Sequence, residues 1–214
     1  TRKESSAASD VYKRQLVSRL ANEEQSTEQQ ANIRKVNTLL ERTEWLISTL
    51  LKIARLESGT VQFSDESIPI EALVNDILEP LEILMDIKDI SISCDIKNNA
   101  SFIGDRLWST EAIGNILKNC IEHCPNGGKL EIYSTENPLY TEVIISDNGT
   151  GFDEKDIPHL FDRFYRGSNS AKESAGIGLN LSRMIISKQN GVITAANKIS
   201  GGAQFTIRIY KGAI

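Results

Sequence analysis

The stretch NILKNCIEHC, residues 115–124, holds side chains that could bind a metal ion or take part in catalysis. It contains two of the three cysteines and one of the two histidines in the 214-residue chain. Asn115 and Asn119 are four residues apart and therefore share one face of a helix. Their amide oxygens are hard ligands, which suit a Mg²⁺ ion that keeps most of its waters and bridges phosphates.

The cysteines of this stretch, Cys120 and Cys124, raise the alternative of a zinc site. Zn²⁺ takes about four ligands, usually from spaced pairs of residues. Only His123 and the distant Cys94 could complete such a set, and His123 is adjacent to Cys124 rather than on its face. We therefore expect small, partly buried helix cysteines rather than a metal-bound thiolate.

Three later stretches could contact a ligand. DNGTG, residues 147–151, ends a predicted strand, where a carboxylate can accept from an exocyclic amine; by itself it also fits an ordinary turn. SAGIGLNLS, residues 174–182, is a glycine-rich entry to a helix, whose free N–H groups can bind phosphate. LFDRFYRG, residues 160–167, places two arginines beside three aromatic residues, as in a mobile lid or an anchored surface loop.

The elements that must position these stretches follow from hydrophobic periodicity. Spacings of three and four predict helices over 27–57, 71–85, 105–122 and 176–190, and alternation predicts strands over 90–96, 129–135, 140–147, 191–198 and 203–210. A short extended connector is expected over 60–70. The order predicts an α+β fold, a two-layer α/β sandwich with a mainly antiparallel sheet and helices on one face.

The long helix over 27–57 carries a heptad-like apolar seam of the kind found in helical bundles. The seam and its flanking stripe comprise Val36, Leu39, Thr43, Leu46, Leu50 and Ile53, with Ile33, Leu40, Ile47 and Ala54. One long helix with a helix stub over 16–24 cannot close a bundle alone, so we expect a homodimer. Packing of this helix onto the downstream domain is the alternative. We expect a partial helical hairpin over 16–61 and a second domain over 62–214.

Composition narrows the class of protein. The net charge of −5 argues against general nucleic-acid binding. The longest apolar stretch, WLISTLLKIA, is shorter than the roughly 20 residues that span a bilayer. Three cysteines without scaffold spacing favour a reducing compartment. Residues 1–15 are polar and end in DVYKRQ, which a transposon-end sequence can encode, so we expect a non-native or disordered tail there and poor order over 1–30.

Taken together, the four stretches resemble the catalytic half of bacterial sensor histidine kinases, within the superfamily that includes Hsp90, MutL and DNA gyrase. NILKNCIEHC resembles the asparagine box, DNGTGF the first glycine box, LFDRFYRG the aromatic box and AGIGLNLS the second glycine box. LISTLLKIARLESGTVQF resembles the second helix of the dimerisation and phosphotransfer bundle, and GGAQFTI a terminal glycine turn. The resemblance covers residues 16–210 and implies a Bergerat-type ATP-binding fold.

The resemblance implies roles for the residues around adenine and metal. Asn119 would hold Mg²⁺ on ATP, with Asn115 assisting. Asp147 would accept the adenine amine. His123 would pack beside the adenine or ribose, and Gly149 and Gly151 would shape that pocket.

It also implies roles around the phosphates. The nucleotide-binding set would include Phe161, with Arg163 and Arg166 placing the lid and γ-phosphate. The phosphates would be cradled by Gly176, Gly178 and Leu179. The implied reaction is transfer of the ATP γ-phosphate to a histidine of the dimerisation helix, for relay to an aspartate of a response regulator. The chain would act on the cytoplasmic side of a parent that reaches the membrane only through upstream segments.

The sequence departs from the family pattern at several positions. Glu122 stands where many members carry a lysine, and it could weaken a phosphate contact or serve as a base. Ser174 and Ser200 replace glycines of the second glycine box and terminal turn. The phosphoacceptor histidine, expected before Leu16, is missing. The alternatives to a kinase are a non-catalytic docking module and another superfamily member, such as an anti-sigma serine kinase or an ATP-driven clamp.

Overall fold

The computed structural model describes residues 27–97, 99–167 and 175–212. The predictions for residues 1–15 and for the helix stub over 16–24 lie outside this range, as does Ser174. The chain divides into two compact units, Thr1–Leu50 and Leu51–Ile214. The predicted domain boundary near residue 62 therefore stays a prediction. Among the described residues, no helix is long and apolar enough to cross a membrane.

The first described element is a long helix, α2 (Thr27–Glu57), with the bounds that its sequence predicts. It contains neither glycine nor proline, and it stops shortly before Gly59, whose φ of 67° is favourable for glycine. Ile53 and Leu56, in its last turns, are fully buried and belong to the second compact unit. The end of the helix is therefore part of the core of that unit.

The second unit contains a five-stranded sheet in the order β2-β4-β5-β7-β6. Its strands are β2 (Ser91–Ile96), β4 (Lys129–Glu136), β5 (Tyr140–Asp147), β6 (Gly191–Asn197) and β7 (Ala203–Tyr210). The β2–β4 pair is parallel and the other three pairs are antiparallel. The expected α+β two-layer sandwich is confirmed, with one parallel pair at its edge.

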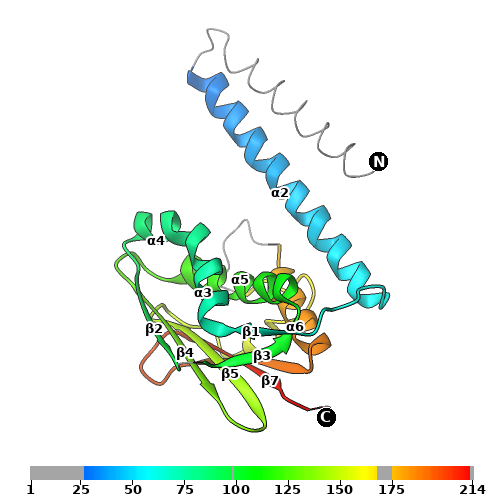
Figure 1. Ribbon diagram of the computed structural model, residues 1–214. Helices are drawn as coiled ribbons and strands as arrows, with labels where there is room; N and C mark the ends of the chain where they lie inside the picture. The colour runs from blue at the N-terminus through cyan, green and yellow to red at the C-terminus, as the bar shows by residue number, and fades with distance from the viewer. Residues whose placement is uncertain (1–26, 98, 168–174, 213–214) are drawn as a thin grey trace. The chain divides into compact units, whose positions relative to one another are not determined.

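Helices cover one face of this sheet, as Figure 1 shows for α3 (Ile70–Leu78), α5 (Arg106–His123) and α6 (Gly178–Lys188). Alternate strand residues point into the layer between sheet and helices, and Phe205 is the largest fully buried side chain. Aromatic edges from Phe152 and Phe161 meet its ring, with centroids 5.5 and 6.4 Å away. The core therefore forms directly beneath the segments that carry the candidate site.

Two expectations need correction. The helix predicted over 71–85 is broken into α3, the 3-10 turn η1 (Glu79–Leu81) and α4 (Glu82–Lys88). Pro80 causes the break, because it lacks an N–H and its ring obstructs the preceding helical turn. The connector over 60–70 contains a strand, β1 (Glu66–Pro69), which pairs with β3 (Ser101–Gly104) in a separate two-stranded sheet.

Candidate functional site

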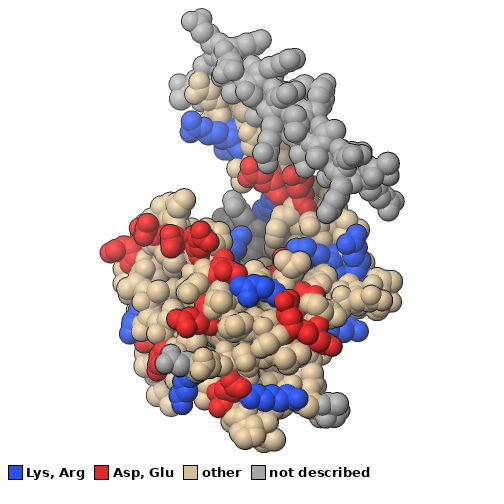
Figure 2. All heavy atoms as spheres, viewed as in Figure 1, with Lys and Arg blue, Asp and Glu red and all other residues tan. Residues whose placement is uncertain are grey.

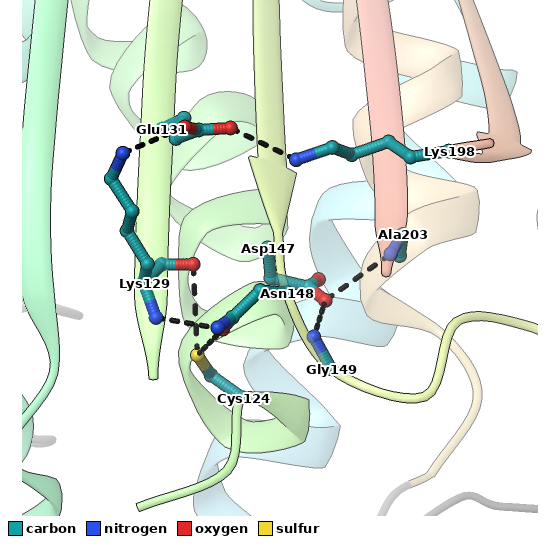
Figure 3. A network of polar contacts seen from close by, with 8 residues as sticks. All are labelled: Cys124, Lys129, Glu131, Asp147, Asn148, Gly149, Lys198 and Ala203. Atoms are coloured by element: carbon teal, nitrogen blue, oxygen red, sulfur yellow. Dashed lines mark hydrogen bonds and ion pairs between the residues drawn. The ribbon is translucent and has the colours of Figure 1, made fainter. Parts of the chain in front are cut away.

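Asp147 lies at the end of β5 with a buried carboxylate that is only half satisfied. Its Oδ1 accepts hydrogen bonds from the N–H groups of Gly149 at 2.8 Å and Ala203 at 3.2 Å, as Figure 3 shows. Its Oδ2 is buried and has no hydrogen-bond partner among the described residues. A buried acceptor without a partner is costly. The site is thus suited to a ligand that brings its own N–H donor, such as an exocyclic amine.

Glycines let the backbone close tightly around this carboxylate. A Cβ on Gly202, whose φ is 95°, would overlap the Asp147 carbonyl oxygen. A Cβ on Gly149 would lie 2.8 Å from the His123 carbonyl oxygen and 3.0 Å from Asp147 Oδ1. The turn between β6 and β7 therefore approaches Asp147, and the end of α5 approaches Gly149, at distances that only glycine permits.

The loop after Asp147 is tied to β4 and to α5. Asn148 Oδ1 accepts the Lys129 N–H at 2.7 Å and lies 3.6 Å from the Cys124 sulfur, as drawn in Figure 3. Burial, and after it the Asp147 carboxylate, raise the pKa of the Cys120 thiol well above its ordinary value. Among the described residues, no group of three or more His, Cys, Asp or Glu side chains could hold a metal ion. The thiols serve here as protonated, buried packing groups.

A second carboxylate fastens the terminal turn to β4. Lys198 Nζ lies 2.9 Å from one oxygen of Glu131, and Lys129 Nζ lies 2.9 Å from the other (Figure 3). Hydrogen bonds from these two ammonium groups hold the pKa of Glu131 at about 2, below its ordinary value of 4.5. The pair with Lys198 joins the chain after β6 to the strand beside Asp147.

One face of α5 carries the polar side chains of the predicted asparagine box. Asn115 Nδ2 is buried and has no hydrogen-bond partner among the described residues. The Cβ position of Gly178, at the start of α6, is 3.8 Å from Asn115 Cγ. Asn119 follows one turn later and is half-buried. Asn115 therefore faces the free N–H groups at the start of α6, where an anionic ligand would lie.

Glu122, the residue that departs from the family pattern, has a basic neighbour on the same helix. Its Oε1 lies 3.8 Å from Lys118 Nζ, and both side chains are substantially exposed. Lys118 is three residues after Asn115 and one before Asn119, so it shares the polar face of α5. The position of the missing family lysine is thus flanked by another lysine, one helical turn away.

Helix α5 is held at both of its ends by residues distant in sequence. At the N-terminus, Asp105 caps the helix by accepting the Trp108 N–H at 3.0 Å, and Gln189 Oε1 accepts the Asp105 N–H at 2.6 Å. At the C-terminus, Lys88 Nζ donates to three carbonyl oxygens at 2.7–3.0 Å, those of Ile121, Glu122 and Cys124. A cation at these free carbonyls also interacts favourably with the helix dipole.

The aromatic segment is joined to the start of α6. Asn180 Nδ2 donates to the Phe161 carbonyl at 2.8 Å, and the Phe164 N–H donates to the Gly176 carbonyl at 2.9 Å. Gly176, with a φ of 67°, packs so closely on Tyr165 that a Cβ would overlap its carbonyl oxygen. Phe161 itself is buried, so it anchors the segment in the core.

The remaining predicted site residues are more exposed. Arg163 is exposed, lies over the Phe164 ring at 5.2 Å and approaches Glu57 Oε1 at 3.3 Å. The side chains of His123 and Arg166 are also exposed, and Leu179 is half-buried in the first turn of α6. Gly151, with a φ of 73°, packs against Asn197, whose amide bonds both backbone groups of Phe152 at 2.7 and 2.9 Å.

Sequence analysis missed four residues that shape this site: Lys88, Asn148, Asn180 and Asn197. Asn148 and Asn180 lie inside the quoted boxes, so their positions could have been noticed from the motif alone. Lys88 and Asn197 act on residues at least 33 positions away. No local pattern could have revealed those partners.

Comparison with known proteins agrees with this geometry. The family of histidine kinase-, DNA gyrase B- and HSP90-like ATPases matches residues 104–212, just over half of the chain. The match begins at the last residue of β3 and includes every box described above. The chain therefore belongs to this family, whose members bind ATP. Its curated relatives and the solved structures of the same fold include sensor histidine kinases.

The curated relatives are sensor proteins and sensor histidine kinases by name. The sensor-like histidine kinase SenX3 of Mycobacterium tuberculosis is 23% identical over 167 residues, which cover 77% of this chain and 41% of that protein. The sensor protein SphS of Synechococcus elongatus is 28% identical over 180 residues, covering 79% of this chain and 44% of SphS. The chain thus spans less than half the length of these curated relatives.

Solved structures show the same fold. The histidine kinase AdeS of Acinetobacter baumannii superposes with a TM-score of 0.72 at 21% identity, over 89% of this chain and 87% of the AdeS chain. Full-length ShkA superposes with a TM-score of 0.76 at 17% identity, over 92% of this chain and 42% of ShkA. These likenesses concern the fold alone.

The contact between Gly202 and Asp147 generates the first prediction. Gly202→Ala should destabilise the protein more than Gly201→Ala, because both glycines have positive φ but only Gly202 lacks room for a Cβ. We expect Gly201→Ala to cost the strain of a left-handed residue, about 1–2 kcal/mol. Gly202→Ala should cost at least twice as much, as measured by urea unfolding. Equal costs would show that the close approach to Asp147 is not constraining.

The contacts of Lys88 generate the second prediction. Lys88→Met removes a charged donor from three helix carbonyls and should lower the free energy of unfolding by about 1.5–3 kcal/mol. Lys88→Arg should lower the free energy of unfolding by less, because a guanidinium can still donate to carbonyls. Lys97→Met is the matched control at an exposed lysine and should change stability by less than about 0.5 kcal/mol. If Lys88→Met left the free energy of unfolding unchanged, Lys88 would not stabilise the end of α5.

The ion pairs of Glu131 generate a pH prediction. Its folded pKa of about 2 lies below the ordinary 4.5, so its contribution is complete above pH 4.5 and disappears as the pH falls towards 2. Wild type should exceed Glu131→Gln in thermal stability at pH 7, and the difference should shrink between pH 5 and 3. In a Lys198→Met background the pH-dependent difference should be smaller. A difference independent of pH would rule out the ion pairs as its source.

Proposed function

We propose that this chain is the ATP-binding catalytic domain of a sensor histidine kinase that transfers the ATP γ-phosphate to a histidine of the dimerisation helix. The observation that carries the proposal is a pair of buried polar atoms, Asn115 Nδ2 and Asp147 Oδ2, that have no hydrogen-bond partner within residues 27–97, 99–167 and 175–212. They occupy the asparagine box and the first glycine box, within a family that binds ATP. Both atoms gain a partner if a nucleotide binds between the boxes.

The adenine end of the nucleotide would be bound by Asp147. Its unpartnered Oδ2 is an acceptor for the exocyclic amine, while Oδ1 stays fixed by Gly149 and Ala203. Burial, and after it the neighbouring Asp147 carboxylate, raise the pKa of the Cys120 thiol, so the group beside the carboxylate is neutral. His123 and Gly151 would border the ring and ribose.

The phosphate end would be bound by α5 and the start of α6. The free N–H groups at Gly178 and Leu179 would bind phosphate oxygens, with Arg163 and Arg166 reaching the γ-phosphate. The half-buried amide of Asn119 suits Mg²⁺, an ion that prefers oxygen ligands and, when bound, would neutralise phosphate charge. Asn115 would assist Asn119, and Phe161 and Gly176 would keep the aromatic segment beside the phosphates.

The chemical step is an in-line displacement. An imidazole nitrogen of the acceptor histidine attacks the γ-phosphorus, the bond to the β–γ bridging oxygen breaks, and ADP leaves. The residues of this chain bind and orient the phosphates, which is the main catalytic contribution in phosphoryl transfer. Glu122, exposed and paired with Lys118, could take up the imidazole proton.

The proposal also covers the oligomeric state, the location and the partner of the full protein. Several apolar residues of α2 are exposed, among them Val36 at 53%, Leu39 at 59% and Ile47 at 54%, which supports a homodimer through a helical hairpin over 16–61. The full protein would anchor in a membrane through other segments, work at its cytoplasmic side and pass phosphate to a response regulator. ShkA, which shares the fold, was solved in complex with AMPPNP.

Nucleotide titrations with and without Mg²⁺ test the roles of the two boxes. Asp147→Ala should weaken ATP binding about 10-fold to 150-fold in both conditions, because it loses a hydrogen bond to a charged acceptor. Asn119→Ala should weaken binding about tenfold or more with Mg²⁺ and little in EDTA. Asn126→Ala, at an exposed turn, is the control.

Phosphate transfer is tested by supplying the acceptor helix with its histidine as a separate protein. Acid-labile phosphate should appear on that helix with wild type and be lost with Asn119→Ala. Nucleotide binding without transfer would favour the docking module. Phosphate on a serine would indicate a serine kinase instead. Failure to bind ATP, with the fold intact by circular dichroism, would overturn the proposal altogether.

A further inference from the structure

The short helix α4 carries an apolar ridge on its outer side. Ile83 and Ile87 are 75% and 76% exposed and lie one helical turn apart, while Met85 is the buried residue of the helix. β-Branched isoleucine is a mediocre helix former, so local propensity does not explain two of them in a seven-residue helix. Both side chains leave most of their apolar surface in water, so folding of the described part of the chain gains little from the ridge.

Four exposed carboxylates lie within four residues of the ridge in the sequence: Glu79, Glu82, Asp86 and Asp89. Figure 2 shows acidic side chains gathered at the upper left of the second unit, where Figure 1 places α4. None of the four takes part in an ion pair with any residue in the described part of the chain. Residues 71–96 hold seven acidic residues and one lysine, a formal charge of −6 against −5 for the whole chain.

The single lysine of this segment is turned away from the carboxylates. Lys88 donates to the carbonyl oxygens of Ile121, Glu122 and Cys124 at the end of α5. Its donors are therefore used in the fold, and the acidic surface has no basic side chain of its own segment to pair with.

Glu82, in the first turn of α4, lies at the favourable end of the helix dipole, but the other positions in this helix do not serve its stability. Glu82 and Asp86 are four residues apart, where like charges repel. Asp86 lies in the last turn and Asp89 is the C-cap residue, at the negative end of the helix dipole. Exposed carboxylates beside an exposed apolar ridge, two of them at the unfavourable end of the helix dipole, are typical of a binding surface with charge preference.

We propose that the α4 surface, defined as Ile83, Ile87 and these four carboxylates, docks a partner protein through an amphipathic helix with a basic rim. The negative charge of this surface decides which class of partner can bind to it. Anionic lipid and nucleic acid are repelled by a segment of charge −6. A second copy paired through the same surface would bring the two acidic sets together. A helix with an apolar stripe accepts an i, i+4 ridge in its groove, and lysine or arginine beside that stripe pairs with the rim.

The test uses the whole chain and a labelled helical peptide with one leucine face and one lysine face. The peptide should bind the wild-type protein and protect residues 79–89 from hydrogen exchange. Ile83→Ser with Ile87→Ser should weaken binding about tenfold or more, given the apolar area lost. Leu139→Ser is the matched control, since Leu139 is 72% exposed in the distant turn between β4 and β5. ATP affinity should be unchanged in all of these variants.

Charge reversal provides a readout that misfolding cannot imitate. Glu82→Lys with Asp86→Lys should weaken binding of the lysine peptide and create binding of the same peptide with glutamate in place of lysine. Asp65→Lys, at an exposed acidic residue outside the surface, should do neither.

Three results would overturn the proposal. The first is a lysine peptide with serine in place of leucine that binds as tightly as the leucine peptide. Binding would then come from unspecific charge attraction alone. The second is binding unaffected by the Ile83 and Ile87 changes. The third is concentration-dependent self-association that is abolished by Ile83→Ser, which would make a second copy the occupant.

Discussion

The buried carboxylate of Asp147 is the constraint on which the rest of the site depends. One oxygen is fixed by two backbone N–H groups, and the other is buried without a partner among the described residues. Such an arrangement costs free energy and persists only where the surroundings hold it rigidly. The surroundings do so through the close approach of Gly202 and through Asn148, which joins the following loop to β4. The folded state therefore presents a buried acceptor that is fixed in place before any ligand arrives.

Helix α5 brings the second half of the site to the first. Its asparagines lie in the middle, and its two ends are fixed by residues from other elements, Gln189 after α6 and Lys88 at the end of α4. Because both ends are held, Asn115 and Asn119 keep a constant position relative to Asp147. This is the type of preorganisation that phosphoryl transfer needs, since positioning supplies most of the catalysis.

The sequence predicts those parts of the structure that depend on local patterns. The bounds of α2 follow from an uninterrupted helical period and the glycine after it, and the strands of the main sheet follow from alternation. The break at Pro80 was missed, because apolar spacing continues through it. Strand β1 is short and exists only by pairing with β3, about 35 residues away in the chain. Within the site, the boxes are local motifs, whereas the contacts of Lys88 and Asn197 join distant segments and have no local signal.

The contacts between the aromatic segment and the start of α6 have a thermodynamic consequence. Asn180 bonds the Phe161 carbonyl, Phe164 bonds the Gly176 carbonyl, and Arg183 lies over the Phe161 ring at 5.7 Å. Any ligand that orders the first turn of α6 therefore also favours one arrangement of residues 161–165. By reciprocity, whatever stabilises that arrangement raises the affinity of α6 for its ligand by the same factor. The two segments form a single coupled equilibrium, and a protein that binds one of them shifts the conformation of the other.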